Sequence, residues 1–267
     1  MAGSGSRLRT TGTSLPKPLV PVFGRPLILY ALEALACAGI KKVHFVVGFE
    51  RDLIKARMRP LIPVELDVCF IENRDWQKQN GISVLAAANQ VERPFLLIMS
   101  DHLFDQSILD LLLCTAIPDQ VNLAIDRKLD SIFDLTDAMK VRTSGDRIIA
   151  IGKDLPGYDA IDTGLFVCPA DVFSYLERAK QNGDCSLADG VRLMAGADKV
   201  RGVDIGEAWW QDVDTPEMLQ RAEEHVGAIS RRVLAVTGME LDRVAKRRTE
   251  SFARQELKPG CRRQLSK

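Results

Sequence analysis

The chain has 267 residues, of which 46% are hydrophobic and 6% aromatic, and its 36 Lys and Arg balance its 36 Asp and Glu. A net charge of zero gives no reason to expect binding to nucleic acid or to an anionic membrane surface. The length allows one α/β domain with a short appendage, and the low aromatic content favours a sheet covered by helices over an all-β sandwich.

The first hundred residues alternate between helix-like and strand-like apolar patterns, as expected of a sheet with crossover helices. The last strand of this part is wholly apolar and leads directly into Asp101. The patterns predict helices over Pro26–Ala38, Arg51–Met58 and Gly81–Val91, and strands over Val43–Gly48, Val64–Ile71 and Pro94–Ser100.

The second half contains several strands with few helices between them, which predicts a small, partly antiparallel region on the substrate side. Helices resume later, and a long one runs from Pro216 towards Gly238. We predict one domain over residues 1–229 and a basic tail, partly helical or disordered, over 230–267. The predicted strands are Val121–Ile125, Ala138–Arg142, Arg147–Ile151 and Ile161–Val167, and the predicted helices are Pro169–Lys180 and Ser186–Met194.

The six cysteines lack any C-x-x-C spacing and mostly lie in apolar runs, which is typical of reduced thiols in the cytoplasm. No apolar stretch has the length needed to cross a bilayer, and the first residues lack the pattern of a signal peptide. We therefore predict a cytoplasmic protein.

A glycine-rich stretch, Gly3-Ser4-Gly5-Ser6-Arg7, precedes Lys17, which lies between two prolines. Glycines let backbone N–H groups close on a polyphosphate, because no Cβ stands in the way. Arginine can grip phosphate oxygens with its planar fork, and lysine adds a point charge. A flexible terminal tail would have a similar composition, but Lys17 between prolines favours the phosphate loop.

Three aspartates are candidate ligands of a divalent ion. Asp101 follows the apolar strand, where ligands of open α/β sheets collect, although it could also cap a helix beginning near Asp105. Asp212 and Asp214 are two residues apart on an extended segment, so their side chains point the same way. Because Asp214 could instead cap the helix that begins at Pro216, we favour Asp212 and leave Asp214 open.

Further polar residues mark candidate contacts with ligands. Asn80-Gly81-Ile82-Ser83 opens a helix, whose amino end can hold an anion or a polar ligand edge, although a simple cap is equally compatible. Lys153 follows a strand and could neutralise a substrate phosphate, or lie solvated on the surface. Asp162-Thr163-Gly164 belongs to the same constellation, and His102 is the histidine we expect near the site.

Together these motifs, with their spacing from Ala2 to about Ile229, resemble the CTP:inositol-1-phosphate cytidylyltransferase family. That family belongs to the nucleotidyltransferases with a Rossmann-like, GT-A-type α/β fold, in which a mixed, mostly parallel sheet carries helices on both faces. The motifs that carry the resemblance are Ala2–Leu8, Pro16–Val20, Asn80–Leu85, Met99–His102, Ile151–Leu155, Asp162–Val167 and Trp210–Thr215.

The resemblance implies a role for each matching residue. Lys17 and Arg7 would act on the phosphate under attack, with Asp101 completing the catalytic set. Asp101 and Asp212, with Asp214 as a further candidate, would hold Mg²⁺. The acceptor would meet Lys153, Asp162, Thr163 and Gly164. The nucleotide CTP would be bound by Ala2, Gly3, Gly5, Ser6, Arg7, Lys17, Asn80, Gly81 and Ser83.

Two departures from the family stand out. Its members carry an apolar strand before the glycine loop, whereas this sequence opens inside the loop. We expect either an upstream start or a cut chain, and a weakened or inactive protein if Met1 is the true start. The family's domain is often fused to a membrane-embedded phosphatidyltransferase-like synthase, which is absent after Ile229, so a separately encoded synthase is the expected partner.

Several functions remain open beside cytidylyl transfer to inositol 1-phosphate. The acceptor could be phosphocholine, a phosphonate or a sugar 1-phosphate, the last with UTP, GTP or dTTP. A homologue that binds a nucleotide without turnover would fit the missing strand. A GT-A glycosyltransferase usually carries Asp-x-Asp after a strand, a form that Ser100-Asp101-His102 lacks.

Overall fold

The structure is a computed structural model that describes residues 3, 8, 15–92 and 94–231. The chain divides into two compact units, Met1–Ala222 and Glu223–Lys267. In the second unit the described residues, 223–231, are helical. The rest of the predicted basic tail lies outside the described residues, so the boundary at 229 stays a prediction.

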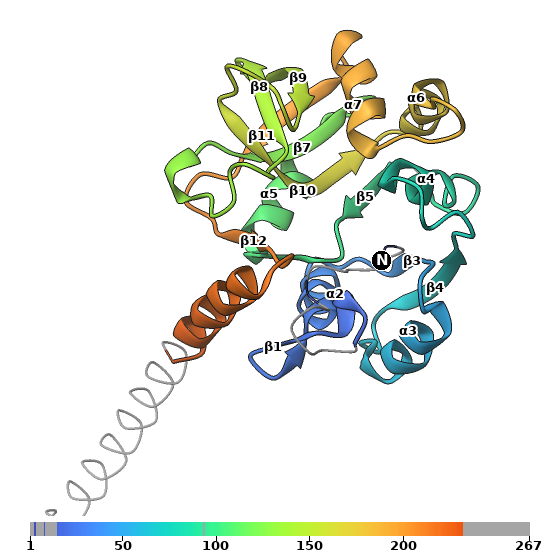
Figure 1. Ribbon diagram of the computed structural model, residues 1–267, viewed down its shortest axis with the longest axis vertical. Coiled ribbons are helices and arrows are strands. Elements are labelled where there is room, and N and C mark those ends of the chain that lie inside the picture. The colour runs from blue at the N-terminus through green and yellow to red at the C-terminus, as the bar shows by residue number, and fades with distance from the viewer. Residues whose placement is uncertain (1–2, 4–7, 9–14, 93, 232–267) are drawn as a thin grey trace, which may run out of the picture. The chain divides into compact units, whose positions relative to one another are not determined.

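The first unit begins with a small layer in which helices α2 and α3 pack against the parallel pair β3–β4 (Figure 1). Its core joins Ile28 and Leu32 of α2 to Phe45 and Val47 of β3. The predicted helices and strands of this part are confirmed, with ends that differ by a few residues. The elements are η1 (Lys17–Leu19), β1 (Pro21–Val22), β2 (Arg25–Pro26), α2 (Leu27–Cys37), β3 (Lys42–Val47), α3 (Arg51–Met58), η2 (Arg59–Leu61) and β4 (Asp67–Glu72).

A six-stranded mixed sheet forms the rest of the unit, in the order β5-β10-β7-β11-β9-β8. Within the described residues its parallel pair is β7–β11, and the other neighbours are antiparallel. The expectation of a mostly parallel sheet is therefore wrong, because β10 returns between β5 and β7 and runs against both. The strands are β5 (Phe95–Ile98), β7 (Val121–Asp126), β8 (Lys140–Ser144), β9 (Arg147–Gly152), β10 (Ala160–Cys168) and β11 (Val200–Asp204).

Helices cover both faces of this sheet, as predicted. Successive residues of β10 point to opposite faces, so Leu165 meets α5 while Phe166 meets α6 and α7. Helix α4 is shorter than the predicted Gly81–Val91, because i→i−3 hydrogen bonds such as Ala87 N–H to the Val84 oxygen continue it as turns. These helices are α4 (Asn80–Leu85), α5 (Gln106–Thr115), η3 (Leu129–Ser131), α6 (Val172–Ala179) and α7 (Leu187–Gly196).

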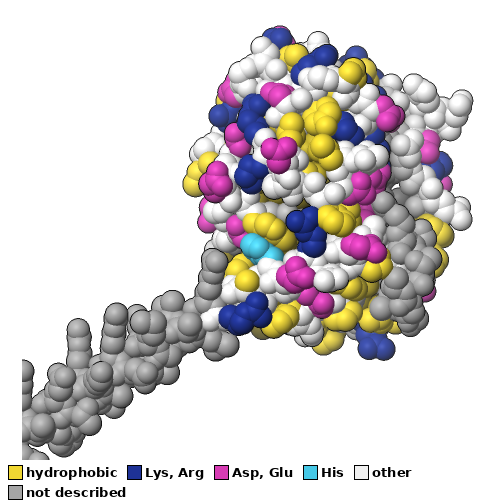
Figure 2. Space-filling view, turned by 60° about the vertical axis from the view of Figure 1, so that its left-hand side comes forward, with side chains coloured by type: hydrophobic (Ala, Val, Ile, Leu, Met, Phe, Trp, Pro, Cys, Tyr) yellow, Lys and Arg dark blue, Asp and Glu magenta, His cyan; other side chains and the backbone are white. Residues whose placement is uncertain are grey.

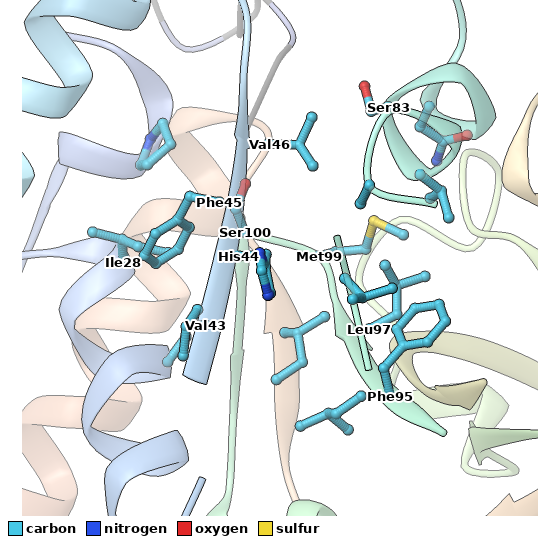
Figure 3. A pocket seen from close by; sticks show the side chains of 18 of the residues that line it. Ile28, Val43, His44, Phe45, Val46, Ser83, Phe95, Leu97, Met99 and Ser100 are labelled. Atoms are coloured by element: carbon cyan, nitrogen blue, oxygen red, sulfur yellow. The ribbon is translucent and has the colours of Figure 1, made fainter. Parts of the chain in front are cut away.

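A cavity of about 840 Å³ separates β3 from β5, and we call it the slot (Figure 3). Consecutive residues of both strands line it, so each strand presents an edge to it. Apolar side chains of α2 and of the segment from α4 to residue 91 complete its walls. Lys42 and Glu92 form an ion pair of 3.7 Å, so the amino ends of β3 and β5 lie close together.

Candidate active site

At the carboxyl end of β5 the slot meets a charged cluster built from three distant segments. Lys17, the first residue of η1, places its Nζ 2.5 Å from Oδ2 of Asp101 and pairs also with Asp214. Its side chain is only 12% exposed. The N–H of Val213 donates to the backbone oxygen of Asp101 at 2.9 Å, which ties the two acidic segments together. The structure thus joins residues that the sequence separates by up to 197 positions.

The charges of the cluster stabilise one another. Burial opposes the charged form of Lys17, yet the carboxylates of Asp101 and Asp214 hold the pKa of Lys17 above its usual value. Burial likewise opposes ionisation of Asp101, but Lys17 and the hydrogen bond from His102 keep the pKa of Asp101 well below its usual range. Both groups are therefore charged at neutral pH, and in this structure the two carboxylates neutralise the ammonium group of Lys17.

His102 connects this cluster to the strand pair β6 (His102–Phe104) and β12 (Trp210–Asp212). Its Nδ1 lies 2.9 Å from Oδ1 of Asp101. Burial opposes protonation, but this bond and the charge of Asp101 raise the pKa of His102. The indole ring of Trp210 stacks on the imidazole, with centroids 5.7 Å apart and planes 9° from parallel. We expected His102 near the site, whereas the sequence held no signal for the stacking of Trp210.

The structure bears on the cap role considered for Asp214, while its metal role stays a prediction. The hydroxyl of Thr215 accepts the N–H of Met218 at 3.3 Å, so Thr215 caps the helix that begins at residue 216. Asp214 turns instead to Lys17. Asp212, the favoured metal ligand, lies opposite His102 in the strand pair and accepts a hydrogen bond from Gln211. Burial and the nearby charges of Asp214 and Asp101 raise the pKa of Asp212.

Asp101 does not cap a helix either. Strand β6 separates it from α5, whose cap position is taken by Asp105. The carboxylate of Asp105 accepts the N–H of Trp209 at 2.8 Å. The side chain of Asp101 is therefore committed to Lys17 and His102.

The predicted phosphate loop is described at one position in the site. Gly3 lines the slot together with Lys17, Asp101 and Asp214. The other residues predicted to cradle the triphosphate, Ala2, Gly5, Ser6 and Arg7, lie outside the described residues, and their roles stay predictions.

Asn80, Gly81 and Ser83 form the start of α4, and Asn80 and Ser83 line the slot. Asn80 accepts the N–H of Leu187 at 2.8 Å, so its side chain oxygen caps the first turn of α7. A Cβ at Gly81 would lie 2.6 Å from the backbone oxygen of Cys185, which is closer than atoms can pack. Asn80 and Gly81 therefore hold α4 against α7, whatever they contribute to nucleotide binding.

The predicted acceptor residues do not gather at one point. Lys153 is paired with Asp137 at the surface. The buried hydroxyl of Thr163 donates to the backbone oxygen of Ala124 at 2.9 Å, which is a bond inside the sheet. Gly164 adopts φ +79°, and a Cβ there would lie 2.7 Å from Nε2 of His102. Of this set, Gly164 is the residue that the structure brings to the charged cluster.

Asp162 accepts the N–H of Gly164 at 2.7 Å, and burial raises the pKa of Asp162 to about 6. A carboxyl group with a raised pKa in the folded state costs stability once the pH exceeds its unfolded value of 3.8, and the full cost is reached above about 6. We expect Asp162→Asn to raise the free energy of unfolding by about 1–3 kcal/mol at pH 8, because each tenfold change in an ionisation constant corresponds to about 1.4 kcal/mol. Below pH 4 the difference should vanish. Thermal melts of both proteins across this range would contradict the idea if the difference did not depend on pH.

The predicted Mg²⁺ can be compared with the donor groups. In the described part of the chain, no three side chains of His, Cys, Asp or Glu come together as a metal site. Mg²⁺ is usually held by one or two carboxylates together with substrate phosphates and waters, so it needs no complete protein cage. Asp101 and Asp214 converge on Lys17 and supply two such carboxylates. The donor set therefore fits Mg²⁺ that arrives with a nucleotide.

The molecular face in Figure 2 carries both basic and acidic side chains. Its basic and acidic side chains are interspersed, without a patch of a single sign. Among the described helices, none has the length and apolar character that spanning a bilayer requires.

Comparisons with known proteins show the family of the chain. Residues 1–184 match the MobA-like NTP transferase domain. A bifunctional IPC transferase and DIPP synthase of Rubrobacter xylanophilus is 34% identical over 228 residues, which covers 84% of this chain and 50% of that protein. The protein of the same description from Archaeoglobus fulgidus is 33% identical over 221 residues, covering 83% and 41%. The chain thus spans half or less of the length of these relatives.

Solved structures show the same fold. The inositol-1-phosphate CTP transferase of T. maritima superposes with a TM-score of 0.72 at 27% identity, over 84% of this chain and 94% of that one. A UDP-glucose pyrophosphorylase of Acinetobacter baumannii gives a TM-score of 0.68 at 18% identity, over 92% and 96%. The second likeness establishes the fold alone.

Proposed function

The chain belongs to the MobA-like NTP transferase family, and from that membership we propose that it transfers a cytidylyl group from CTP to inositol 1-phosphate and releases pyrophosphate. The observation that carries the proposal is the cluster of Lys17 with Asp101 and Asp214 at the end of β5, beside Gly3. The acceptor and the nucleotide follow from the named activity of the relatives and of the T. maritima protein.

The reaction needs little from the protein beyond position and charge. A phosphate oxygen of the acceptor attacks the α-phosphorus of CTP, the bond from that phosphorus to the bridging oxygen breaks, and pyrophosphate leaves in line. Negative charge develops on the oxygens around phosphorus, and in our proposal the ammonium group of Lys17 stabilises it. No covalent enzyme intermediate is required.

Mg²⁺ would supply Lewis-acid stabilisation of the same phosphate oxygens when it is bound with the nucleotide. In our proposal Asp101 and Asp214 hold it, with Asp212 nearby. Since Lys17 bridges Asp101 and Asp214 in this structure, it would turn towards the triphosphate when the ion binds. Arg7 would add a second cation, as the resemblance implies.

The test is a panel of reactions followed by pyrophosphate release. Purified protein with Mg²⁺ would be given CTP, UTP, GTP or dTTP in turn, each with inositol 1-phosphate, phosphocholine, a phosphonate or a sugar 1-phosphate. Turnover with CTP and inositol 1-phosphate alone supports the proposal. Turnover with UTP and a sugar 1-phosphate would instead identify the protein as a sugar nucleotidyltransferase. A folded protein that releases no pyrophosphate with any pair would favour a homologue that binds a nucleotide without turnover.

We also propose that the product feeds a separate, phosphatidyltransferase-like membrane synthase. This rests on the second activity named for the relatives, whose length is at least twice the part matched here. A pull-down of the membrane fraction with this chain as bait would test direct docking. Free exchange of product between the two activities would contradict docking.

A further inference from the structure

Asp126 is a buried carboxylate that the proposed reaction does not use. It ends strand β7 and is 2% exposed. Its Oδ2 accepts the indole N–H of Trp210 at 2.9 Å, and its Oδ1 accepts both the backbone N–H of Lys128, at 2.8 Å, and the ammonium group of Lys128, at 2.9 Å. Both oxygens are therefore fixed, and one of them serves to orient a tryptophan.

Lys128 holds the other side of the same arrangement. Its ammonium group also donates to the backbone oxygens of Gly206 and Ala208, and the second bond measures 3.3 Å. These two residues belong to the loop that leads into β12. Asp126 thus binds the side chain of Trp210 in β12, and Lys128 binds the backbone of the loop before β12. Both contacts join the end of β7 to this segment.

Trp210 connects this arrangement to the charged cluster by stacking on His102. Its ring lies parallel to the imidazole of His102 at a centroid distance of 5.7 Å. The backbone of Gly164 approaches the imidazole so closely that a Cβ there would be 2.7 Å from Nε2. The imidazole ring of His102 therefore has little freedom to turn. Its Nδ1 lies 2.9 Å from Oδ1 of Asp101.

The hydrogen bond from His102 decides how the carboxylate of Asp101 is turned. With Oδ1 held by His102, Oδ2 is the oxygen that faces Lys17. A carboxylate that acts on a phosphate or a metal must be held to within about 0.5 Å, and groups behind such a ligand commonly change activity about 10- to 100-fold when removed.

We propose that Asp126 and Trp210 are positioning residues for Asp101, acting through the imidazole of His102. The inference rests on the proposed function, because it assumes that Asp101 acts on the nucleotide or its metal. Asp126 is 2% exposed and does not line the slot, so contact with substrate would not reveal its role.

Two pairs of variants test it in the full chain. Trp210→Leu removes the stacked ring, and Asp126→Leu removes the acceptor of the indole N–H. We expect each to lower kcat about 10- to 100-fold while KM for the nucleotide changes less than about threefold. Asp126→Asn retains an oxygen that can accept the indole N–H and should recover most of the lost kcat. Trp209→Phe is the matched control, because the contacts of Trp209 with Asp105 are made by its backbone.

A spectroscopic measurement separates positioning from failure of the proposed reaction. The proton on Nδ1 of His102, hydrogen-bonded to Asp101, should give a downfield NMR signal that Trp210→Leu and Asp126→Leu weaken or shift and Asp126→Asn keeps. If the wild-type protein turned over no pair of the panel, this signal would still test the inference. Folded Leu variants with unchanged kcat, or with an unchanged His102 signal, would overturn it. A Leu variant that does not fold is replaced by Trp210→Phe, which keeps the ring but loses the N–H.

Discussion

Replacing Asp101 by asparagine should lower the rate of pyrophosphate release roughly 100- to 1,000-fold, the loss typical of removing one group that stabilises charge in the transition state. The substitution keeps the size of the side chain but removes the negative charge that Lys17 and a magnesium ion would share. Lys17 keeps Asp214 as a partner, so no buried cation is left unpaired. We therefore expect the fold to survive, with kcat affected far more than KM.

The comparison needs a carboxylate that lies away from the cluster. Asp110 is an exposed residue of α5 that accepts a hydrogen bond from Gln106, so Asp110→Asn makes the same chemical change on the surface. Steady-state kinetics and circular dichroism of both variants give the answer. Near-normal turnover by Asp101→Asn would show that the metal and catalytic assignment of Asp101 is wrong.

Local patterns were enough to predict most elements of the first unit. The apolar spacing of α2 and the wholly apolar β5 are properties of short segments, and the structure has both where they were expected. The order of strands is different, because it depends on pairing between distant segments. Nothing in the residues of β10 says that this strand runs against β5 and β7, so the sheet was expected to be more parallel than it is.

The residues of the site also differ in whether the local sequence could predict them. Lys17 and Asp101 stand out in the sequence because a lysine between prolines and an aspartate after an apolar strand are unusual by themselves. Asp214 could not be assigned from the sequence, because a helix cap and a metal ligand share the same sequence signature. The structure shows that the hydroxyl of Thr215 caps the helix. The contact between Asp126 and Trp210 gives no local signal, because it spans 84 positions and exists only once β7 and β12 are in place.

An apolar strand added to the amino end of the chain should raise the midpoint of thermal unfolding by about 5–10 °C. Gly3 lines the slot, so five or six Val, Ile and Leu residues placed ahead of it can reach the space between β3 and β5. Each buried aliphatic side chain contributes about 1.5–3 kcal/mol, against about 1–2 kcal/mol per residue for ordering the backbone. Hydrogen bonds to two open strand edges add about 0.5–1.5 kcal/mol each. A net gain of a few kcal/mol corresponds to this shift, at about 2–4 °C per kcal/mol for a unit of this size.

The strand should also change the site, since it would run parallel to β3 and β5 and end beside Asp101. Protein interiors are close-packed, so an apolar space of about 840 Å³ lets the edges around it move, and filling it should hold Gly3 and Lys17 in place. His44 points into the slot, and its buried ring nitrogens lack a hydrogen-bond partner in the described part of the chain, so a backbone beside it offers one (Figure 3). An extension of equal length made of Ser and Gly is the control. Equal melting temperatures for the two extended proteins would mean that the slot does not accept a strand. If the apolar extension raised both the melting temperature and kcat, the open edges of β3 and β5 would be shown to limit catalysis.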